Sequence, residues 1–307
     1  MPSAADTDQA PGGTTELAGQ RVARIGFGAM QLADVGHPAP DRDVALAVLR
    51  RAVARGVNHI DTAQFYGPGT ANELIRAALS PFPRGLALVS KVGAEHAGEG
   101  GIVPAQRPRQ LRESVEANLA TLGTDHLAVV NLRRLDASPG LRAEGDQLVD
   151  LDSQLAELMA LRDEGKIGGI GLSGVSAGQL RQSLAAGIAC VQNAYSVLDR
   201  ASEPVLRLCR EQDIAWVPFF PLGSAFPGRP QVTGHPAVIA AAASYAATPA
   251  QVGLAWLLAS YSRTLLIPGT ASVAHLDDNI AAGSLRLKPE TVAALDQLAA
   301  VPGEGTG

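Results

Sequence analysis

Aromatic side chains, cysteines and long apolar runs are all scarce in this chain of 307 residues. Aromatic residues make up only 4% of the sequence although 46% of it is hydrophobic. We therefore expect a core of small aliphatic side chains packed between many helices. No run of about 18 apolar residues occurs, so no membrane-spanning helix is expected. The first 16 residues have neither a basic start nor an apolar stretch, which predicts no secretory signal and a cytoplasmic location.

The chain has only two cysteines, Cys190 in the apolar run IACVQ and Cys209 in a predicted helix. Without an export signal, buried free thiols are the expected state rather than a disulfide. The net charge of -5 and the lack of a basic face argue against a nucleic-acid partner. The six histidines have no ligand spacing, so no metal site is expected. The sequence carries no signal for the oligomeric state.

Strand and helix patterns alternate along the chain after an N-terminal β-hairpin that turns around Ala18 and Gly19. The expected strands are residues 25–28, 57–61, 86–91, 126–132, 167–173, 189–194, 214–219 and 264–268. The expected helices lie within 41–56, 72–80, 107–123, 148–166, 177–187, 203–212, two stretches of 236–260, 273–283 and 289–300. Eight alternations with short connections favour an α/β fold closed into a (β/α)8 TIM barrel, with an extra C-terminal helix.

The expected domain organisation is a single barrel over residues 14–300. Residues 1–13 are small, polar and rich in Pro and Gly, so they are predicted to be a disordered tail. Residues 301–307 are predicted to be a flexible C-terminus. The longest irregular segments are 93–107, 134–147 and 222–235, and we expect them at the rim, where functional loops belong.

An acid, a phenol and an ammonium are predicted to meet at that rim. Asp61 and Lys91 each follow a short apolar run, and Tyr66 comes five residues after Asp61. Parallel barrel strands deliver their last residues to one rim. A free phenol has a pKa of about 10, which the Lys91 ammonium would lower while Asp61 keeps Lys91 charged. Each residue alone also fits an ordinary surface Tyr, Lys or capping Asp, but the three at successive strand ends favour proton donation to a carbonyl oxygen.

Six motifs, HIDTAQFYG, VSKVG, IGLSGVS, VQNAYSVLDR, VPFFPLGS and IPGTASVAHLDDN, occur in this order. With them the chain resembles the aldo-keto reductase superfamily from about Leu17 to Leu298. The resemblance implies a (β/α)8 barrel that binds NADPH in extended form and reduces aldehydes or ketones. It also implies that Tyr66, Asp61 and Lys91 are catalytic, with Tyr66 as the acid.

Arg133 departs from the pattern of that family. It lies in NLRRLD, where most relatives have a His, and His126 is no substitute because it lies at the opposite end of its strand. A guanidinium stays protonated and cannot relay a proton as an imidazole does. Our hypothesis is that Arg133 clamps the developing oxyanion or an anionic substrate group and lowers the pKa of Tyr66 further. The alternative is that Arg133 folds outward into a salt bridge.

No GxGxxG follows the first strand, so a Rossmann-type nucleotide site is not indicated. In IPGTASVAHLDDN, Gly269 permits a close backbone approach, Thr270 and Ser272 supply hydroxyls, and the following helix presents free N–H groups. By resemblance this segment holds the adenosine 2′-phosphate and adenine. His275 stands where many relatives have Arg, and the segment has no Lys or Arg; NADPH is still expected rather than NADH.

The resemblance extends the cofactor site to other strand ends. It implies that Phe219 stacks on the nicotinamide, that Ser173 and Gln192 contact its carboxamide, and that Gly174 replaces a usual Asn. The predicted cofactor-binding residues are Gly28, Ala29, Met30, Asp61, Ser173, Gln192, Phe219, Phe220, Pro221, Leu222, Gly223, Ser224, Gly269, Thr270, Ala271, Ser272, His275, Asp278 and Asn279.

The segments AVVNLR, VPFFPLG and IPGTASVAHL are most similar to a bacterial subgroup that resembles pyridoxal reductases. This implies a small-molecule carbonyl substrate, with reduction of pyridoxal to pyridoxine as the specific reaction. Arg133 suits a substrate with a phenolate beside its aldehyde. Two alternatives stay open: a tailoring carbonyl reductase of secondary metabolism, and a non-catalytic nucleotide-sensing subunit on the same barrel. The intact Asp61, Tyr66 and Lys91 favour an enzyme.

Overall fold

The computed structural model describes residues 10–35, 38–98, 101–136, 141–223 and 231–298. It begins with an antiparallel hairpin of β1 (Thr14–Leu17) and β2 (Gln20–Ala23). The two turn residues, Ala18 and Gly19, have positive φ angles of 48° and 76°. Such a turn matches the twist of the two strands it joins, and the hairpin lies where the sequence predicts it.

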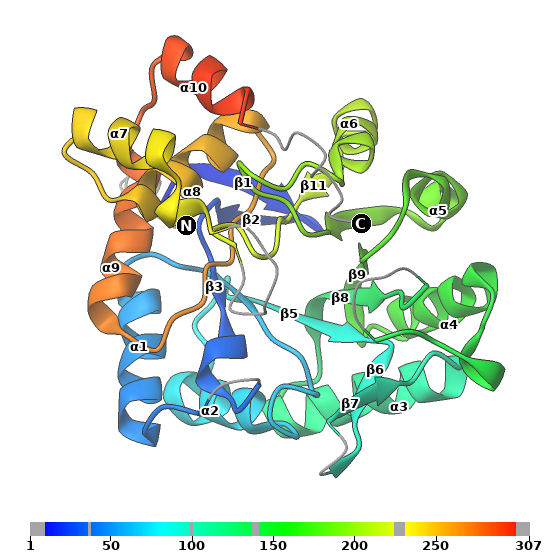
Figure 1. Cartoon of the computed structure of the whole chain (residues 1–307). Helices are drawn as coiled ribbons and strands as arrows, with labels where there is room; N and C mark the ends of the chain where they lie inside the picture. The colour runs from blue at the N-terminus through cyan, green and yellow to red at the C-terminus, as the bar shows by residue number, and fades with distance from the viewer. Residues whose placement is uncertain (1–9, 36–37, 99–100, 137–140, 224–230, 299–307) are drawn as a thin grey trace.

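A curled, parallel seven-stranded sheet forms the centre of the molecule, in the order β11-β10-β9-β8-β5-β4-β3 (Figure 1). In chain order its strands are β3 (Phe27–Gly28), β4 (His59–Asp61), β5 (Ala87–Val92), β8 (Leu127–Arg133), β9 (Ile167–Ser173), β10 (Ile188–Gln192) and β11 (Ala215–Trp216). Each falls within or next to a predicted strand.

The eighth predicted strand, residues 264–268, is reduced to single bridges, but it still closes the sheet. Thr264 bridges to Trp216 on one side, and Leu266 bridges to Ile25 on the other. The Leu265 N–H donates to the Trp216 carbonyl at 2.8 Å, and the Gly26 N–H donates to the Leu266 carbonyl at 2.7 Å. The two edges of the sheet are thus joined, as the predicted (β/α)8 barrel requires.

Helices surround the strands (Figure 1) and lie where the sequence predicts them. They are α1 (Arg42–Ala54), α2 (Thr70–Leu79), α3 (Pro108–Leu122), α4 (Leu151–Asp163), α5 (Ala177–Ser183), α6 (Glu203–Glu211), α7 (Pro236–Ser244), α8 (Pro249–Ser260), α9 (Val273–Ala281) and α10 (Pro289–Asp296). Within the described residues, no single helix is both long and apolar enough to cross a membrane; α7 and α8 reach that composition only as a pair bent by 90°.

Two predictions about irregular segments need correction. Residues 93–107 contain a short hairpin of β6 (Ala94–His96) and β7 (Ile102–Pro104), whose three-residue strands are too short to show an alternating pattern. At the N-terminus, Ala10–Gly13 are hydrogen-bonded rather than disordered: the Ile25 N–H donates to the Pro11 carbonyl at 3.0 Å. Parts of the other predicted segments, 1–9, 137–140, 224–230 and 299–307, lie outside the described residues.

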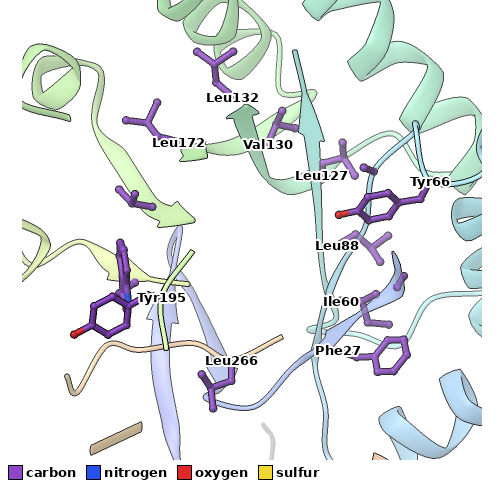
Figure 2. Packing of buried hydrophobic residues seen from close by; sticks show 14 of the residues in the cluster. Phe27, Ile60, Tyr66, Leu88, Leu127, Val130, Leu132, Leu172, Tyr195 and Leu266 are labelled. Atoms are coloured by element: carbon purple, nitrogen blue, oxygen red, sulfur yellow. The ribbon is translucent and has the colours of Figure 1, made fainter. Parts of the chain in front are cut away.

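Side chains alternate between the inside and the outside of the barrel along each strand. The outward side chains pack beneath the helices, and Figure 2 shows part of that cluster, including Phe27, Ile60 and Leu88. A smaller inward cluster contains Val89 and Val129, and Leu17 of the β1–β2 hairpin packs against it from below. The inward positions below the rim are mostly apolar, with His59 as an exception, whereas the polar side chains of Asp61, Lys91 and Gln192 lie at the ends of their strands. Both cysteines are buried and free, as predicted.

Candidate active site

The alternation of side chains places the predicted site residues on one rim. Asp61, Lys91, Arg133, Ser173 and Gln192 are all at or near the carboxyl ends of their strands, and Ser173 pairs in register with Arg133 on one side and Gln192 on the other. These five residues and Tyr66 line one cleft of about 310 Å³, within the range of small-molecule sites. The structure therefore brings the predicted proton-transfer set together.

Asp61 and Lys91 form a buried ion pair within that set. Lys91 Nζ donates to Asp61 Oδ1 and, at 3.0 Å, to the Thr62 carbonyl. Burial disfavours the charged ammonium, but the negative charge of Asp61 and the interaction with Tyr66 outweigh this effect and raise the pKa of Lys91. Lys91 is therefore a fixed positive charge at any physiological pH.

Tyr66 lies beside this charge, in the loop that follows β4. Lys91 Nζ is 4.9 Å from the centroid of the Tyr66 ring. The ring of Phe65 meets that of Tyr66 edge-on, with centroids 5.3 Å apart. The Tyr66 side chain is 7% exposed, so its ring is held by packing while the residue still lines the cleft. A phenol beside a permanent cation is an arrangement suited to proton donation.

Arg133 is half-buried at the end of β8 and lines the same cleft. Arg133 lines the cleft, and no ion pair of Arg133 is found within the described part of the chain, so the alternative of an outward salt bridge gains no support there. The next residue, Arg134, makes such a pair instead, with its Nη2 2.7 Å from Asp136. Arg133 thus brings a positive charge to the cleft that no described carboxylate pairs with.

Gln192 completes the contacts of Asp61. Its Nε2 donates to Asp61 Oδ2 at 2.6 Å, while its Oε1 is buried with no donor from the described residues. A buried acceptor without a donor fits a ligand that carries an amide N–H. The nicotinamide carboxamide that the sequence predicts at this position has such a group, so the residues present fit this cofactor.

The rest of the cleft matches much of the predicted cofactor set. Two glycines, Gly28 and Gly269, face each other: a Cβ on Gly28 would lie 2.5 Å from the Ile267 carbonyl, and one on Gly269 would lie 2.6 Å from the Gly28 carbonyl. The close approach at Gly269 is thus made by this chain's own backbone. The other predicted cofactor residues that line the cleft are Met30, Phe219, Phe220, Pro221, Leu222, Gly223 and Asn279.

Other predicted cofactor residues lie away from that cleft. Ser272 is the N-cap of α9 and accepts a hydrogen bond from the His275 N–H at 3.4 Å, and His275 itself is exposed. Ala29 is fully buried, Thr270 is buried, Ala271 is half-buried, and Asp278 is exposed. Ser224 lies outside the described residues. The cleft also contains three residues absent from the predicted set, Gln31, Ile267 and Pro268, whose only signal was that each lies within two positions of a predicted residue.

Comparison with known proteins identifies the family. The sequence matches the aldo/keto reductase family over residues 24–300, and the chain belongs to it. Pyridoxine 4-dehydrogenase of Escherichia coli K12 is 43% identical over 286 residues, which are 92% of this chain and 97% of that protein. An uncharacterized oxidoreductase of Schizosaccharomyces pombe is 31% identical over 96% of this chain and 92% of its own length.

Solved structures agree with this assignment. An aldo-keto reductase from Klebsiella pneumoniae in complex with NADPH is 28% identical, has a TM-score of 0.75, and the match covers 93% of this chain and 94% of that chain. The fold and the family that the six motifs predict are therefore confirmed, and the chain is an oxidoreductase.

Proposed function

We propose that this protein reduces a small aldehyde or ketone with NADPH, and that Tyr66 gives the carbonyl oxygen its proton. The observation that carries this proposal is the buried Lys91–Asp61 pair, with the ammonium 4.9 Å from the Tyr66 ring, at the wall of the cleft. When bound, NADPH supplies the hydride. The Klebsiella pneumoniae relative in complex with NADPH supports this cofactor.

Each member of the set has a distinct task in this proposal. As negative charge grows on the substrate oxygen, Tyr66 donates its proton, and the Lys91 ammonium stabilises the phenolate that remains. Asp61 keeps Lys91 charged and aimed, because both of its oxygens are held, one by Lys91 and one by Gln192. Gln192, Ser173 and Phe219 would hold the nicotinamide, and the segment from Gly269 to Asn279 would hold the adenosine end.

We propose pyridoxal as the specific substrate, with pyridoxine as its product. Two observations support it: the 43% identity to pyridoxine 4-dehydrogenase over most of both chains, and the guanidinium of Arg133 in the cleft, which forms no ion pair with a described residue. A cation held there favours a substrate that carries a phenolate beside its aldehyde.

Free, buried Cys190 and Cys209 support a cytoplasmic location.

The substrate proposal is tested by following the loss of NADPH absorbance with pyridoxal, pyridine-4-carboxaldehyde and simple aliphatic aldehydes. We expect the largest kcat/KM with pyridoxal. Equal turnover of all aldehydes would contradict pyridoxal as the specific substrate and indicate a general carbonyl reductase. Failure to oxidise NADPH with any of these carbonyl compounds would contradict the proposed reductase activity.

Tyr66→Phe separates an enzyme from a nucleotide-binding subunit without catalysis. We expect the substitution to lower kcat by about 10²–10⁴-fold because the general acid is lost, while the Kd for NADPH, measured by fluorescence titration, stays unchanged. Tyr245→Phe is the matched control, because Tyr245 contacts Thr291 at 2.9 Å far from the cleft. An unchanged kcat in Tyr66→Phe would contradict the assigned role.

A further inference from the structure

The amide of Gln106 joins the two strands that bring Lys91 and Arg133 to the cleft. Gln106 is 1% exposed, and its Nε2 donates to the Gly93 carbonyl at 2.5 Å and to the Arg133 carbonyl at 2.9 Å. An amide NH₂ has two N–H donors, so one side chain satisfies both carbonyls.

This contact lies where the regular pairing of the two strands stops. The last pair in register between β5 and β8 is Val92 with Leu132. Beyond it, Gly93 has a φ of 100°, and a Cβ there would lie 2.4 Å from the Arg133 carbonyl oxygen. The segments that follow β5 and β8 therefore remain close after the hydrogen bonds between the two strands have ended. Gln106 provides the hydrogen bonds that hold these segments together.

The orientation of the Gln106 amide is imposed by Arg134. A guanidinium has only donors, so Gln154 must turn its Oε1 toward Arg134 Nη1, as it does. Gln154 Nε2 then points at Gln106 and donates to its Oε1 at 3.0 Å. Gln106 is left with its Nε2 facing the two carbonyls. Arg134 is itself anchored by Asp136 at 2.7 Å.

We propose that Gln106 is a positioning residue for Arg133 and thereby a determinant of specificity for carbonyl substrates that carry an anionic group. By holding the Arg133 carbonyl, it sets the backbone from which the guanidinium enters the cleft. The inference rests on the proposed function of Arg133 as a substrate clamp. Gln106 itself lies behind the strand ends and does not line the cleft.

The test is a double-mutant cycle of Gln106→Met and Arg133→Met, with two substrates. Pyridoxal carries the phenolate, and pyridine-4-carboxaldehyde has the same ring without it. We expect Arg133→Met to raise the KM for pyridoxal about 10–100-fold through loss of a charge-assisted contact. Gln106→Met should raise it about 3–10-fold, and should add less than about twofold in the Arg133→Met background, because coupled residues are not additive. The KM for the neutral aldehyde and the Kd for NADPH should not change.

Gln182→Met is the control for loss of a glutamine amide away from the rim, because Gln182 lies on α5 and donates to the Asp152 side chain at 3.0 Å. Equal losses on both substrates, or additive effects in the double mutant, would overturn the positioning role and leave a purely structural Gln106. No effect of Arg133→Met on pyridoxal would instead overturn the substrate clamp, which is a distinguishable failure. Should Gln106→Met not fold, Gln106→Asn replaces it, since a shorter amide reaches at most one of the two carbonyls.

Discussion

At the scale of single residues, His59 shows what the barrel interior does to an ionisable group. It lies on β4 two residues before Asp61 and therefore points inward, and neither of its ring nitrogens has a partner among the described residues. Burial lowers the pKa of His59 to about 4. The imidazole is therefore neutral in the folded protein at neutral pH.

This neutral histidine makes stability depend on pH. In the unfolded chain His59 has a pKa of about 6.5, so between pH 6.5 and 4 the unfolded state binds a proton that the folded state does not. The free energy of unfolding must therefore fall as the pH falls through this window. We expect a loss of about 2 kcal/mol from His59 between pH 7 and pH 5.

Urea denaturation of the wild type and of His59→Leu at both pH values measures this effect. The pH dependence of the variant should be smaller by that amount, whatever its absolute stability. His126→Leu is the control, because His126 lies outside the barrel and contacts the Gly165 carbonyl. Equal pH dependence in wild type and His59→Leu would contradict the prediction.

At the scale of secondary-structure elements, the turn between β5 and β6 depends on Gly93. An alanine there would combine a φ of 100° with a Cβ 2.4 Å from a backbone oxygen. We expect Gly93→Ala to lower the free energy of unfolding by about 2–4 kcal/mol and to lower kcat/KM, since the turn adjoins Lys91 and Arg133.

Gly85→Ala provides a matched comparison. Gly85 has a similar φ of 81°, but a Cβ there would meet nothing within 4 Å. Only the backbone strain remains, which costs about 1–2 kcal/mol. Chemical denaturation of both variants separates the cost of backbone strain from the cost of the steric clash at Gly93. Equal losses of unfolding free energy in the two variants would contradict the clash.

The elements themselves were largely predictable from the sequence. Parallel strands buried on both faces read as apolar runs, and the run at 167–173 predicts β9 with the bounds that the structure has. The strand at 264–268 was predicted from the same kind of run, but its hydrogen bonds depend on neighbours on both sides and are reduced to single bridges. The β6–β7 hairpin was missed because three-residue strands have no periodicity to detect.

The site was predictable only in part. Strand ends of a barrel share a rim, so position alone predicts that Asp61, Lys91, Arg133 and Ser173 lie together, whereas Gln192 came only from the family resemblance. The contacts between them were not predictable. The hydrogen bonds that run from Arg134 through Gln154 to Gln106 join residues that are 20 and then 48 positions apart in the sequence. Which amide group donates in each bond follows from these distant contacts, which no local sequence pattern encodes.

At the scale of the whole molecule, the N-terminal hairpin closes the barrel opposite the active site. Leu17 is 1% exposed and belongs to the inward cluster. We expect Leu17→Ala to lower the free energy of unfolding by about 2–4 kcal/mol through the cavity it leaves, without a change in KM for NADPH or the carbonyl substrate.

Thermal or chemical denaturation together with steady-state kinetics checks this separation of stability from activity. Val44→Ala is the control, because Val44 is 41% exposed and its truncation removes little buried surface. A changed KM in Leu17→Ala would contradict this prediction, because it would show that packing at the hairpin end of the barrel affects binding at the rim.

The isolated bridges at residues 264–266 have a consequence for local opening of the barrel. Isolated bridges, Thr264 to Trp216 and Leu266 to Ile25, join these residues to the neighbouring strands, whereas β8 and β9 pair in register at six positions. We therefore expect amide hydrogens at 264–266 to exchange with solvent sooner than those between β8 and β9. Gly28 and Gly269, close to these residues in the sheet, both line the cleft. A dinucleotide bound across these glycines would stabilise residues 264–266 in their closed state. At 100 times its Kd it should slow amide exchange at Leu265 and Leu266 by up to about 100-fold. Hydrogen–deuterium exchange with and without NADPH measures this, and uniform slowing over the whole barrel would contradict it.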